Sequence, residues 1–439
     1  MFTPARYVVI DDKPDELRQL ADCLHRVGAP CLPILYDQVE GVPAESLAGV
    51  RLLFLDLHLT AGANPNSDIQ QVAAPILEML ENGIKAAAGP YIIILWTSHA
   101  EKRDALEAHL RERLDPGKLP LAVLALDKNI YLAGADAGER LRNDVAEVIQ
   151  TDPRLRALLN WEREVLRAAS ATLSEIGRLV SDEDRTAARF SDRLDEVLSL
   201  LAFEAIGKLN AEADPYSAVN AALMPILSDQ LAYQRVSPDS DAIWKAAVTK
   251  IGEVAAPSLS DAAKLNRMLH LAGPAAEELK PGAWGAVSLL PDIERADEVM
   301  KRRFALPAGP LLATTFCMTD SSDRAKSRLC VLRVGASCDY AQSRPGPVPF
   351  FLGAIVPAAA ARRDRLPQAE VMTPPLMVPD FEEPMIMIFN THLQISMVPE
   401  EFENWPALCR IREALLMQIT THGARHATRP AIISFRPRG

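Results

Sequence analysis

The chain has 439 residues, of which 49% are hydrophobic and 24% are charged, and its formal net charge is −11 at pH 7. This balance is typical of globular proteins, and the length exceeds what one core usually organises, so we expect two or three domains. The negative charge argues against a chain-wide basic surface for nucleic acid, and no apolar run reaches the length of a membrane span.

Six scattered cysteines form no Cys-x-x-Cys pair. Reduced thiols are therefore a simpler expectation than a zinc site or a disulfide framework. The first residues, "MFTPARYVVIDD", lack the basic and apolar regions of a secretory signal, so we expect a cytoplasmic protein without a membrane partner.

Apolar runs alternate with amphipathic segments through the first 150 residues. The apolar runs cover residues 6–10, 30–36, 50–57, 90–98 and 119–127, and segments with helical periodicity cover 14–28, 68–83, 100–114 and 138–150. Strands that are apolar on both faces and separated by helices predict a buried parallel sheet. We expect a doubly wound α/β domain with five parallel strands.

Polar side chains stand at the ends of four of these runs. Asp11 and Asp12 end the first, Asp56 the third, Thr97 the fourth and Lys128 the fifth. The carboxyl ends of parallel strands meet at one edge of a sheet, where ligands bind. Three converging carboxylates repel one another unless a cation lies among them, and Mg²⁺ prefers oxygen ligands. Each residue alone could be an ordinary loop or surface residue, but together they predict a phosphoryl site with a carboxylate nucleophile.

The motifs "VVIDD", "LFLDLHL", "IILWTS" and "LALDK" resemble, in this order, the receiver domain of two-component response regulators over residues 5–150. The resemblance implies a flavodoxin-like fold in which Asp56 is the phosphoacceptor. Thr97 would bind a phosphoryl oxygen and Lys128 would neutralise its charge. It also implies a histidine kinase or phosphotransfer protein as partner, self-phosphorylation and dephosphorylation, and pairing of two copies as a homodimer. The sequence identifies no separate enzymatic activity.

The same resemblance implies a magnesium site. Asp12 and Asp56 would bind Mg²⁺ directly, Asp11 would bind it through water, and the backbone carbonyl of His58 would be a further ligand. The side chain of His58 stands where haloacid-dehalogenase-type phosphatases carry a second aspartate, which argues against that enzyme class.

Two positions depart from the receiver pattern. Ala125 replaces the aromatic switch residue three positions before the lysine, and Asn129 replaces the proline that normally follows it. The spacings from Asp56 to Thr97 and from Thr97 to Lys128 are also longer than usual. An alternative is therefore a degenerate receiver that serves as a non-catalytic interaction module.

The rest of the chain consists of two segments that differ in composition. Residues 151–279 are rich in alanine and leucine with helical spacing, which predicts an all-α segment, and residues 280–439 hold short β-type runs between prolines and glycines. We expect a mostly-β, small barrel-like domain in this last part, with a helix over 408–427. The expected domains are thus 1–150, 151–279 and 280–439.

One motif stands out in the last part. Cys338, Asp339 and Gln342 resemble a "CD-x-x-Q" signature of small β-barrel-like domains in bacterial conflict proteins, and the whole chain resembles response-receiver proteins of bacterial defence systems. The resemblance implies an output in antiviral defence. Cys338 is either a buried thiol or the nucleophile of a receiver-controlled effector enzyme, and its candidate partners are His392, His422 and His426.

Arginines near the C-terminus leave a further alternative open. They could bind phosphate or nucleic acid, or they could lie on a solvated face: Arg410, Arg412, Arg425 and Arg429. No helix-turn-helix pattern with a basic recognition helix accompanies them, so DNA is not the expected partner.

Overall fold

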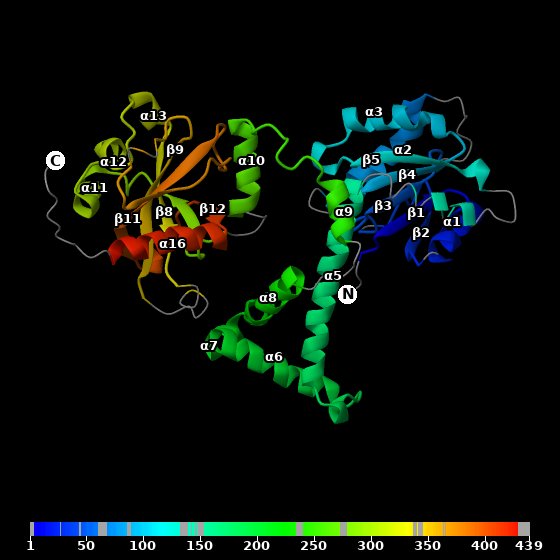
Figure 1. Cartoon of the computed structure of the whole chain (residues 1–439), viewed down its shortest axis with the longest axis horizontal. Helices are drawn as coiled ribbons and strands as arrows, with labels where there is room; N and C mark the ends of the chain where they lie inside the picture. Colours follow the sequence, from blue (N-terminus) through cyan, green and yellow to red (C-terminus); the bar gives the residue numbers. More distant parts are fainter. Residues whose placement is uncertain are drawn as a thin grey trace. The chain divides into compact units, whose positions relative to one another are not determined.

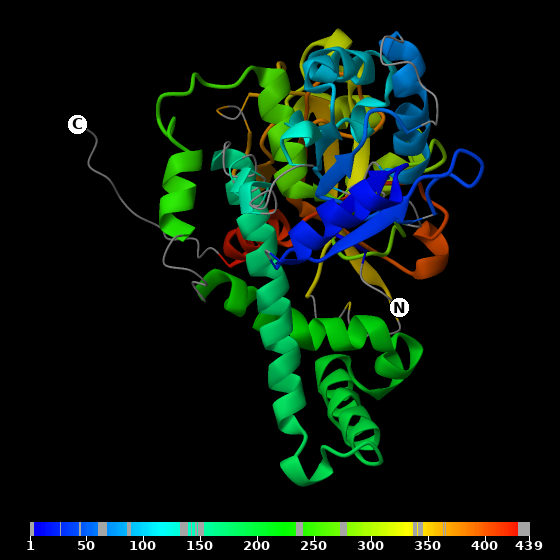
Figure 2. The same cartoon turned by 90° about the vertical axis from the view of Figure 1, so that its right-hand side faces the viewer.

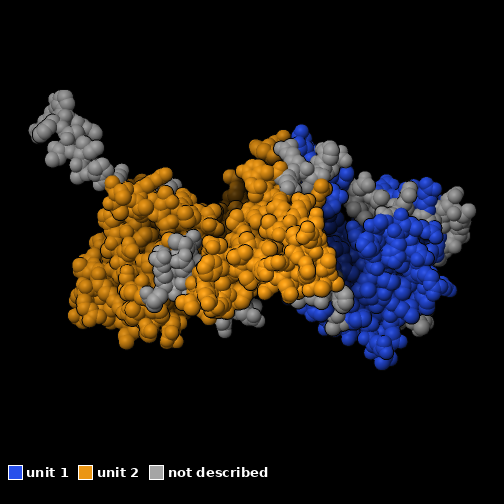
Figure 3. All heavy atoms as spheres, turned by 90° about the horizontal axis from the view of Figure 1, so that it is seen from below, with its two compact units in different colours: residues 1–164, 235–249 blue, residues 165–234, 250–439 orange. Residues whose placement is uncertain are grey.

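The computed structural model describes residues 4–26, 28–43, 45–59, 68–85, 89–131, 139–141, 143–144, 147, 153–233, 240–272, 279–336, 340, 346–362, 364 and 366–428 (Figure 1). The chain divides into two compact units (Figure 3). The first unit consists of residues 1–164 and 235–249, and the second of residues 165–234 and 250–439. The three-part division expected from the sequence stays a prediction.

None of the helices that the structure describes combines the length and the apolar character needed to cross a membrane.

The first unit is built on a five-stranded, all-parallel sheet, as predicted. Its strands are β1 (Tyr7–Asp11), β2 (Cys31–Leu35), β3 (Leu52–Leu55), β4 (Ile92–Thr97) and β5 (Ala122–Asp127), in the order β2-β1-β3-β4-β5. The order reverses at β1, and such a switch point opens a crevice at the carboxyl ends of the neighbouring strands. The helix expected over 138–150 lies largely outside the described residues.

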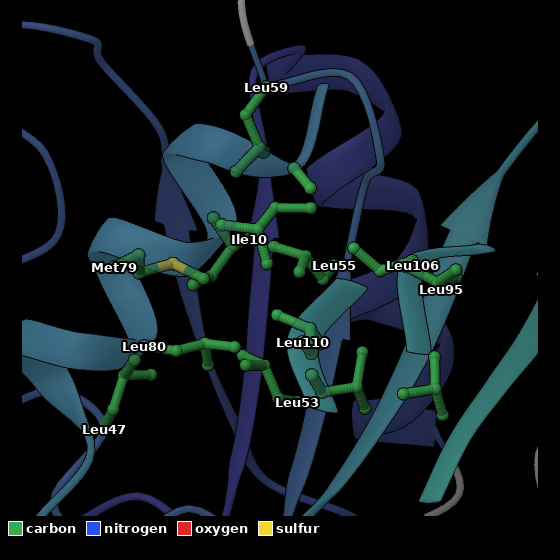
Figure 4. Packing of buried hydrophobic residues seen from close by; sticks show 14 of the residues in the cluster. Ile10, Leu47, Leu53, Leu55, Leu59, Met79, Leu80, Leu95, Leu106 and Leu110 are labelled. Atoms are coloured by element: carbon green, nitrogen blue, oxygen red, sulfur yellow. The ribbon is translucent and has the colours of Figure 1, made fainter. Parts of the chain in front are cut away.

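Helices cover both faces of this sheet. On one face α2 (Ile69–Gly83) and α3 (Arg103–Arg113) pack against alternate strand residues, including Ile10, Leu53 and Leu95 (Figure 4). On the other face α1 (Pro14–Arg26) packs against the residues between them, such as Val9, Phe54 and Ile94. Successive strand residues point to opposite faces, so both sets must be apolar. Each such buried side chain contributes about 1.5–3 kcal/mol.

The described residues between 153 and 270 are mainly helical. The helices are α5 (Pro153–Leu179), α6 (Phe190–Ile206), α7 (Lys208–Ala213), α8 (Pro215–Tyr233), α9 (Ser240–Ala247) and α10 (Leu259–His270). The helix α5 is long and unbroken (Figure 2), and its residues belong to both units. Several of its large apolar side chains, Leu158, Leu166 and Leu173, are exposed, whereas smaller side chains such as Ala168 and Thr172 are buried.

Glu162 interrupts the apolar pattern of α5 for a structural reason. Its carboxylate accepts hydrogen bonds from the Arg51 guanidinium at 2.8 and 3.0 Å and lies 2.8 Å from Arg6 Nη1. These ion pairs attach the beginning of α5 to the chain segment before β1 and to the residue before β3, all within the first unit.

The second unit holds a seven-stranded antiparallel sheet. The strands are β6 (Leu271–Ala272), β7 (Ala286–Leu289), β8 (Arg328–Arg333), β9 (Val348–Pro357), β10 (Glu370–Met372), β11 (Met385–Met397) and β12 (Ala407–Ile411), in the order β10-β11-β9-β8-β7-β12-β6. The sheet is a curled half-barrel, so the expected small barrel is open: among the described residues, β10 and β6 form its two edges.

Two expectations for this unit need correction. It is not mostly β, because α11 (Asp297–Phe304), α12 (Ala308–Thr314), α13 (Ser321–Lys326), α15 (Pro399–Phe402) and α16 (Glu413–Ala427) accompany the sheet. The helix expected over 408–427 begins only at Glu413, and the residues before it form β12. This segment is a strand because β7 and β6 pair with it on both sides and bury Cys409 and Ile411.

Candidate functional site

The three predicted aspartates meet at the carboxyl edge of the parallel sheet. Asp11 is the last residue of β1 and Asp56 follows β3, the neighbouring strand. The Asp56 N–H donates to the Ile10 carbonyl at 3.0 Å, which extends the ladder between β1 and β3 by one step. One carboxylate oxygen from each of Asp11, Asp12 and Asp56 lies within 4.8 Å of the others.

These carboxylates are buried and incompletely satisfied. Asp11 and Asp56 are 0% and 2% exposed, and Asp12 is half-buried. Three buried oxygens have no hydrogen-bond partner, one on each residue: Asp11 Oδ2, Asp12 Oδ1 and Asp56 Oδ1. Unpaired buried carboxylate oxygens are costly, and a hard divalent cation among these three carboxylates would offset that cost. The donor set therefore fits Mg²⁺.

Burial and the neighbouring charge also change the pKa values of Asp11 and Asp12. Burial, reinforced by the nearby charge of Asp56, raises the pKa of Asp11 to about 7 although the Lys13 N–H donates to its Oδ1 at 2.8 Å. Burial and the charge of Asp56 also raise the pKa of Asp12. Both shifts favour neutral carboxyls in the absence of a cation.

Lys128 supplies the positive charge of the site. It follows β5 and is 4% exposed. Its Nζ donates to Asp56 Oδ2 at 3.0 Å and to Glu16 Oε2 at 2.5 Å. Burial alone would lower the pKa of Lys128, but the charge of Asp56 and these hydrogen bonds outweigh burial and raise it.

Glu16 is a site residue that the sequence reasoning missed. It stands in the first turn of α1, and the Lys13 Nζ donates to its second oxygen at 3.0 Å. Although burial raises the pKa of Glu16, the hydrogen bonds from Lys128 and Lys13 lower it overall. The available signal was its position: a helix that leaves the carboxyl end of a strand begins at the same edge of the sheet.

Thr97 and His58 border the acidic cluster. Thr97 ends β4 beside Asp127, the residue before Lys128, and its fully buried hydroxyl accepts the His99 N–H at 3.3 Å. His58 is half-buried, its ring lies 5.0 Å from the His99 ring, and burial lowers its pKa. The role of the His58 backbone carbonyl as a metal ligand stays a prediction.

The position of Lys128 does not depend on a proline after it. The Asp127 side chain accepts the Asn129 N–H at 3.0 Å, and the Ser98 hydroxyl donates to the Asn129 side chain at 3.1 Å. The bond from the Asn129 N–H to Asp127 is typical of a tight turn that begins at an aspartate, and the Ser98 bond links this turn to the end of β4. Ala125 is half-buried within β5, paired with Leu95 of β4.

The predicted residues of the last part of the chain are only partly described. Cys338, Asp339, Gln342 and Arg429 lie outside the described residues. Of the candidate histidine partners, His392 and His426 have ring centroids 4.4 Å apart, and His422 Nε2 lies 2.9 Å from the Gln368 carbonyl oxygen.

No protein-family model matches the sequence, and a search of curated proteins found no match. The order of the motifs along the chain and the geometry of the acidic cluster with Lys128 are therefore the two features that point to a function.

Proposed function

We propose that the first unit is a receiver that accepts a phosphoryl group on Asp56 from a histidine kinase or phosphotransfer protein. The observation that carries the proposal is the state of the Asp56 carboxylate. Its Oδ2 is held by Lys128 at 3.0 Å, whereas its buried Oδ1 has no hydrogen-bond partner. A carboxylate that is fixed at one oxygen and free at the other is suited to nucleophilic attack.

In this reaction the N–P bond of a phosphohistidine breaks and an O–P bond to Asp56 forms. The histidine nitrogen keeps the electron pair, and the product is an acyl phosphate. Lys128 would balance the charge of the transferred group, and the buried Thr97 hydroxyl would donate to one of its oxygens. Both groups are preorganised by the ends of β4 and β5, so little reordering is needed.

The acidic cluster would hold the metal ion. Asp12 and Asp56 are the proposed direct Mg²⁺ ligands, Asp11 the ligand through water, and the His58 carbonyl a further ligand. Support comes from the positions of the three carboxylates, each of which offers one oxygen within 4.8 Å of the others. Bound Mg²⁺ supplies positive charge that offsets the repulsion among these carboxylates and an incoming phosphoryl group.

Lys128 offers a route from phosphorylation to a switch. It is shared between Asp56 and Glu16, at the beginning of α1. A phosphoryl group adds about −1.5 to −2 charges, so the modified Asp56 would compete with Glu16 for the lysine. The output would then pass to the second unit or to a second copy of the chain, in the antiviral setting that the resemblance implies.

Acetyl phosphate with Mg²⁺ tests the proposal. We expect the full-length protein to gain one phosphoryl group, detected by intact-mass spectrometry, and to lose this ability when EDTA is added. Asp56→Asn should abolish the labelling. Asp104→Asn, which changes an exposed carboxylate on α3, is the matched control and should label normally. Labelling that survives Asp56→Asn would refute the assignment of the nucleophile.

A second candidate is a receiver-like interaction module that is not phosphorylated. Ala125 in β5 and the existing bond between Lys128 and Glu16 favour it, because the aromatic switch is missing and the lysine is already paired. Beryllofluoride mimics the phosphoryl group. The module predicts no Mg²⁺-dependent beryllofluoride binding, whereas a working receiver predicts saturable binding that needs Asp56. A receiver-controlled effector enzyme built around Cys338 is the remaining alternative.

A further inference from the structure

A polar cavity lies in the second unit between the β10 strand and the helix α16. Its volume is about 510 Å³, within the range of small-molecule sites. Its polar lining consists of Gln368, Glu370, Gln418, His422, Arg425 and His426. The cavity is distinct from the acidic cluster of the first unit, and nothing in the proposed phosphorylation uses it.

Gly423 brings α16 close to the sheet at this point. It is buried, and a Cβ atom there would lie 3.2 Å from the Phe351 ring and 3.3 Å from Thr391. The missing side chain lets the helix approach Phe351 of β9 and Thr391 of β11, and α16 lies beside β11 (Figure 1). His422 and His426, one residue before and three residues after Gly423, consequently line the cavity.

Glu370 is the buried carboxyl group of the cavity. It is 6% exposed, and its Oε1 accepts the Asn390 Nδ2 at 3.1 Å across the β10–β11 pair. The Asn390 oxygen accepts the His392 and Leu393 N–H groups at 2.9 and 3.2 Å, which fixes the orientation of the amide. Glu370 Oε2 is buried and has no hydrogen-bond partner.

This arrangement has the features of an incomplete binding site. A buried carboxylate with one unsatisfied oxygen is costly unless a ligand donates to it. Arg425 and Gln418 are exposed at the same cavity, and the two histidines are half-buried. The cavity thus offers an acceptor at a buried position and cationic or N–H groups toward solvent.

We propose that this cavity binds a small ligand that has N–H donors at one end and an anionic group at the other. The donors would bind Glu370 Oε2, and the anion would bind the Arg425 guanidinium. A guanidinium-like group on the ligand would match the geometry of a carboxylate such as Glu370. An arginine side chain such as Arg425 binds phosphate and carboxylate groups of a ligand. Guanine nucleotides and free arginine both carry this combination, and the experiment distinguishes these two sources.

Isothermal titration calorimetry on the full-length protein, with EDTA present, tests the proposal with GMP, AMP, arginine and inorganic phosphate. We expect saturable binding of GMP or of arginine, and weaker binding of phosphate because it lacks the donor end. AMP should bind more weakly than GMP, because its base edge presents an acceptor nitrogen where guanine presents a donor.

The variants Glu370→Gln and Arg425→Ala should each weaken binding about tenfold or more, the effect of losing one charge-assisted hydrogen bond. Arg302→Ala, which removes an exposed arginine of α11 outside the cavity, is the matched control and should bind like the wild type. If Glu370→Gln does not fold, the exposed Arg425 still decides the test.

Three outcomes would overturn the proposal. In the first, neither GMP nor arginine binds. In the second, phosphate or AMP binds as tightly as GMP and arginine does not bind. In the third, the ligand that binds the wild type also binds Arg425→Ala with unchanged affinity.

Discussion

Replacing Lys128 by methionine tests whether this lysine neutralises the acidic site. Methionine keeps most of the buried stem but removes the ammonium, so Asp56 and Glu16, whose side chains are 3% and 15% exposed, lose their shared cation. Removing one partner of a buried ion pair leaves an uncompensated charge and costs about 3–5 kcal/mol. We expect a loss of this size in the free energy of unfolding of the first unit at neutral pH without Mg²⁺.

The matched control is Lys85→Met. Lys85 Nζ lies 2.6 Å from Glu45, but both side chains are more than half exposed, and such a pair contributes about 1 kcal/mol or less. Urea titrations read by hydrogen exchange of peptides from β1 and β4 would report the first unit separately from the second.

A double variant, Lys128→Met with Asp56→Asn, sharpens the test. Removing the carboxylate charge should recover part of the stability lost with the lysine, and the recovery measures the coupling between the two residues. Equal losses for Lys128→Met and Lys85→Met would show that the buried lysine does not hold the acidic site together.

Two further predictions concern other buried or paired carboxylates. Burial raises the pKa of Glu370 from 4.5 to about 7. Between these two pH values the folded protein therefore retains a proton that the unfolded chain releases. The free energy of unfolding should fall as the pH rises from about 4.5 to about 7, by an amount on the order of 3 kcal/mol. Urea titrations across this range should show a smaller fall for Glu370→Gln, and identical pH profiles would contradict the shift. Glu162→Gln weakens the ion pairs of α5 with Arg51 and Arg6 and should lower the free energy of unfolding by about 1 kcal/mol. The measurement is hydrogen exchange, which should become faster at the beginning of α5. The exposed Glu204→Gln is the control, and equal exchange in both variants would contradict the anchoring role of Glu162.

Local patterns were sufficient to predict the parallel sheet of the first unit. Its strands are apolar on both faces because helices cover both sides, and this leaves a sequence signal that does not depend on knowing the partners. The convergence of the strand ends could also be predicted. Parallel strands bring residues such as Asp11 and Asp56 to one edge of the sheet, whatever the length of the loops between the strands.

Contacts between distant segments could not be predicted in this way. Glu16 and Lys128 are 112 residues apart, and nothing in the sequence near either residue identifies the other. The segment from Leu408 to Ile411 precedes a helical pattern, which predicts that it belongs to the same helix. It is a strand because β7 and β6, which lie more than a hundred residues earlier in the sequence, supply its hydrogen-bond partners.

The sequence by itself therefore determined the parallel sheet and the set of acidic strand ends. The tertiary structure decided which charges are paired, as for Glu162 with Arg51, and which remain unsatisfied, as for Glu370 Oε2. The physical reason is that apolar periodicity is a local property of the chain. The satisfaction of a buried polar atom depends on the groups that folding brings beside it.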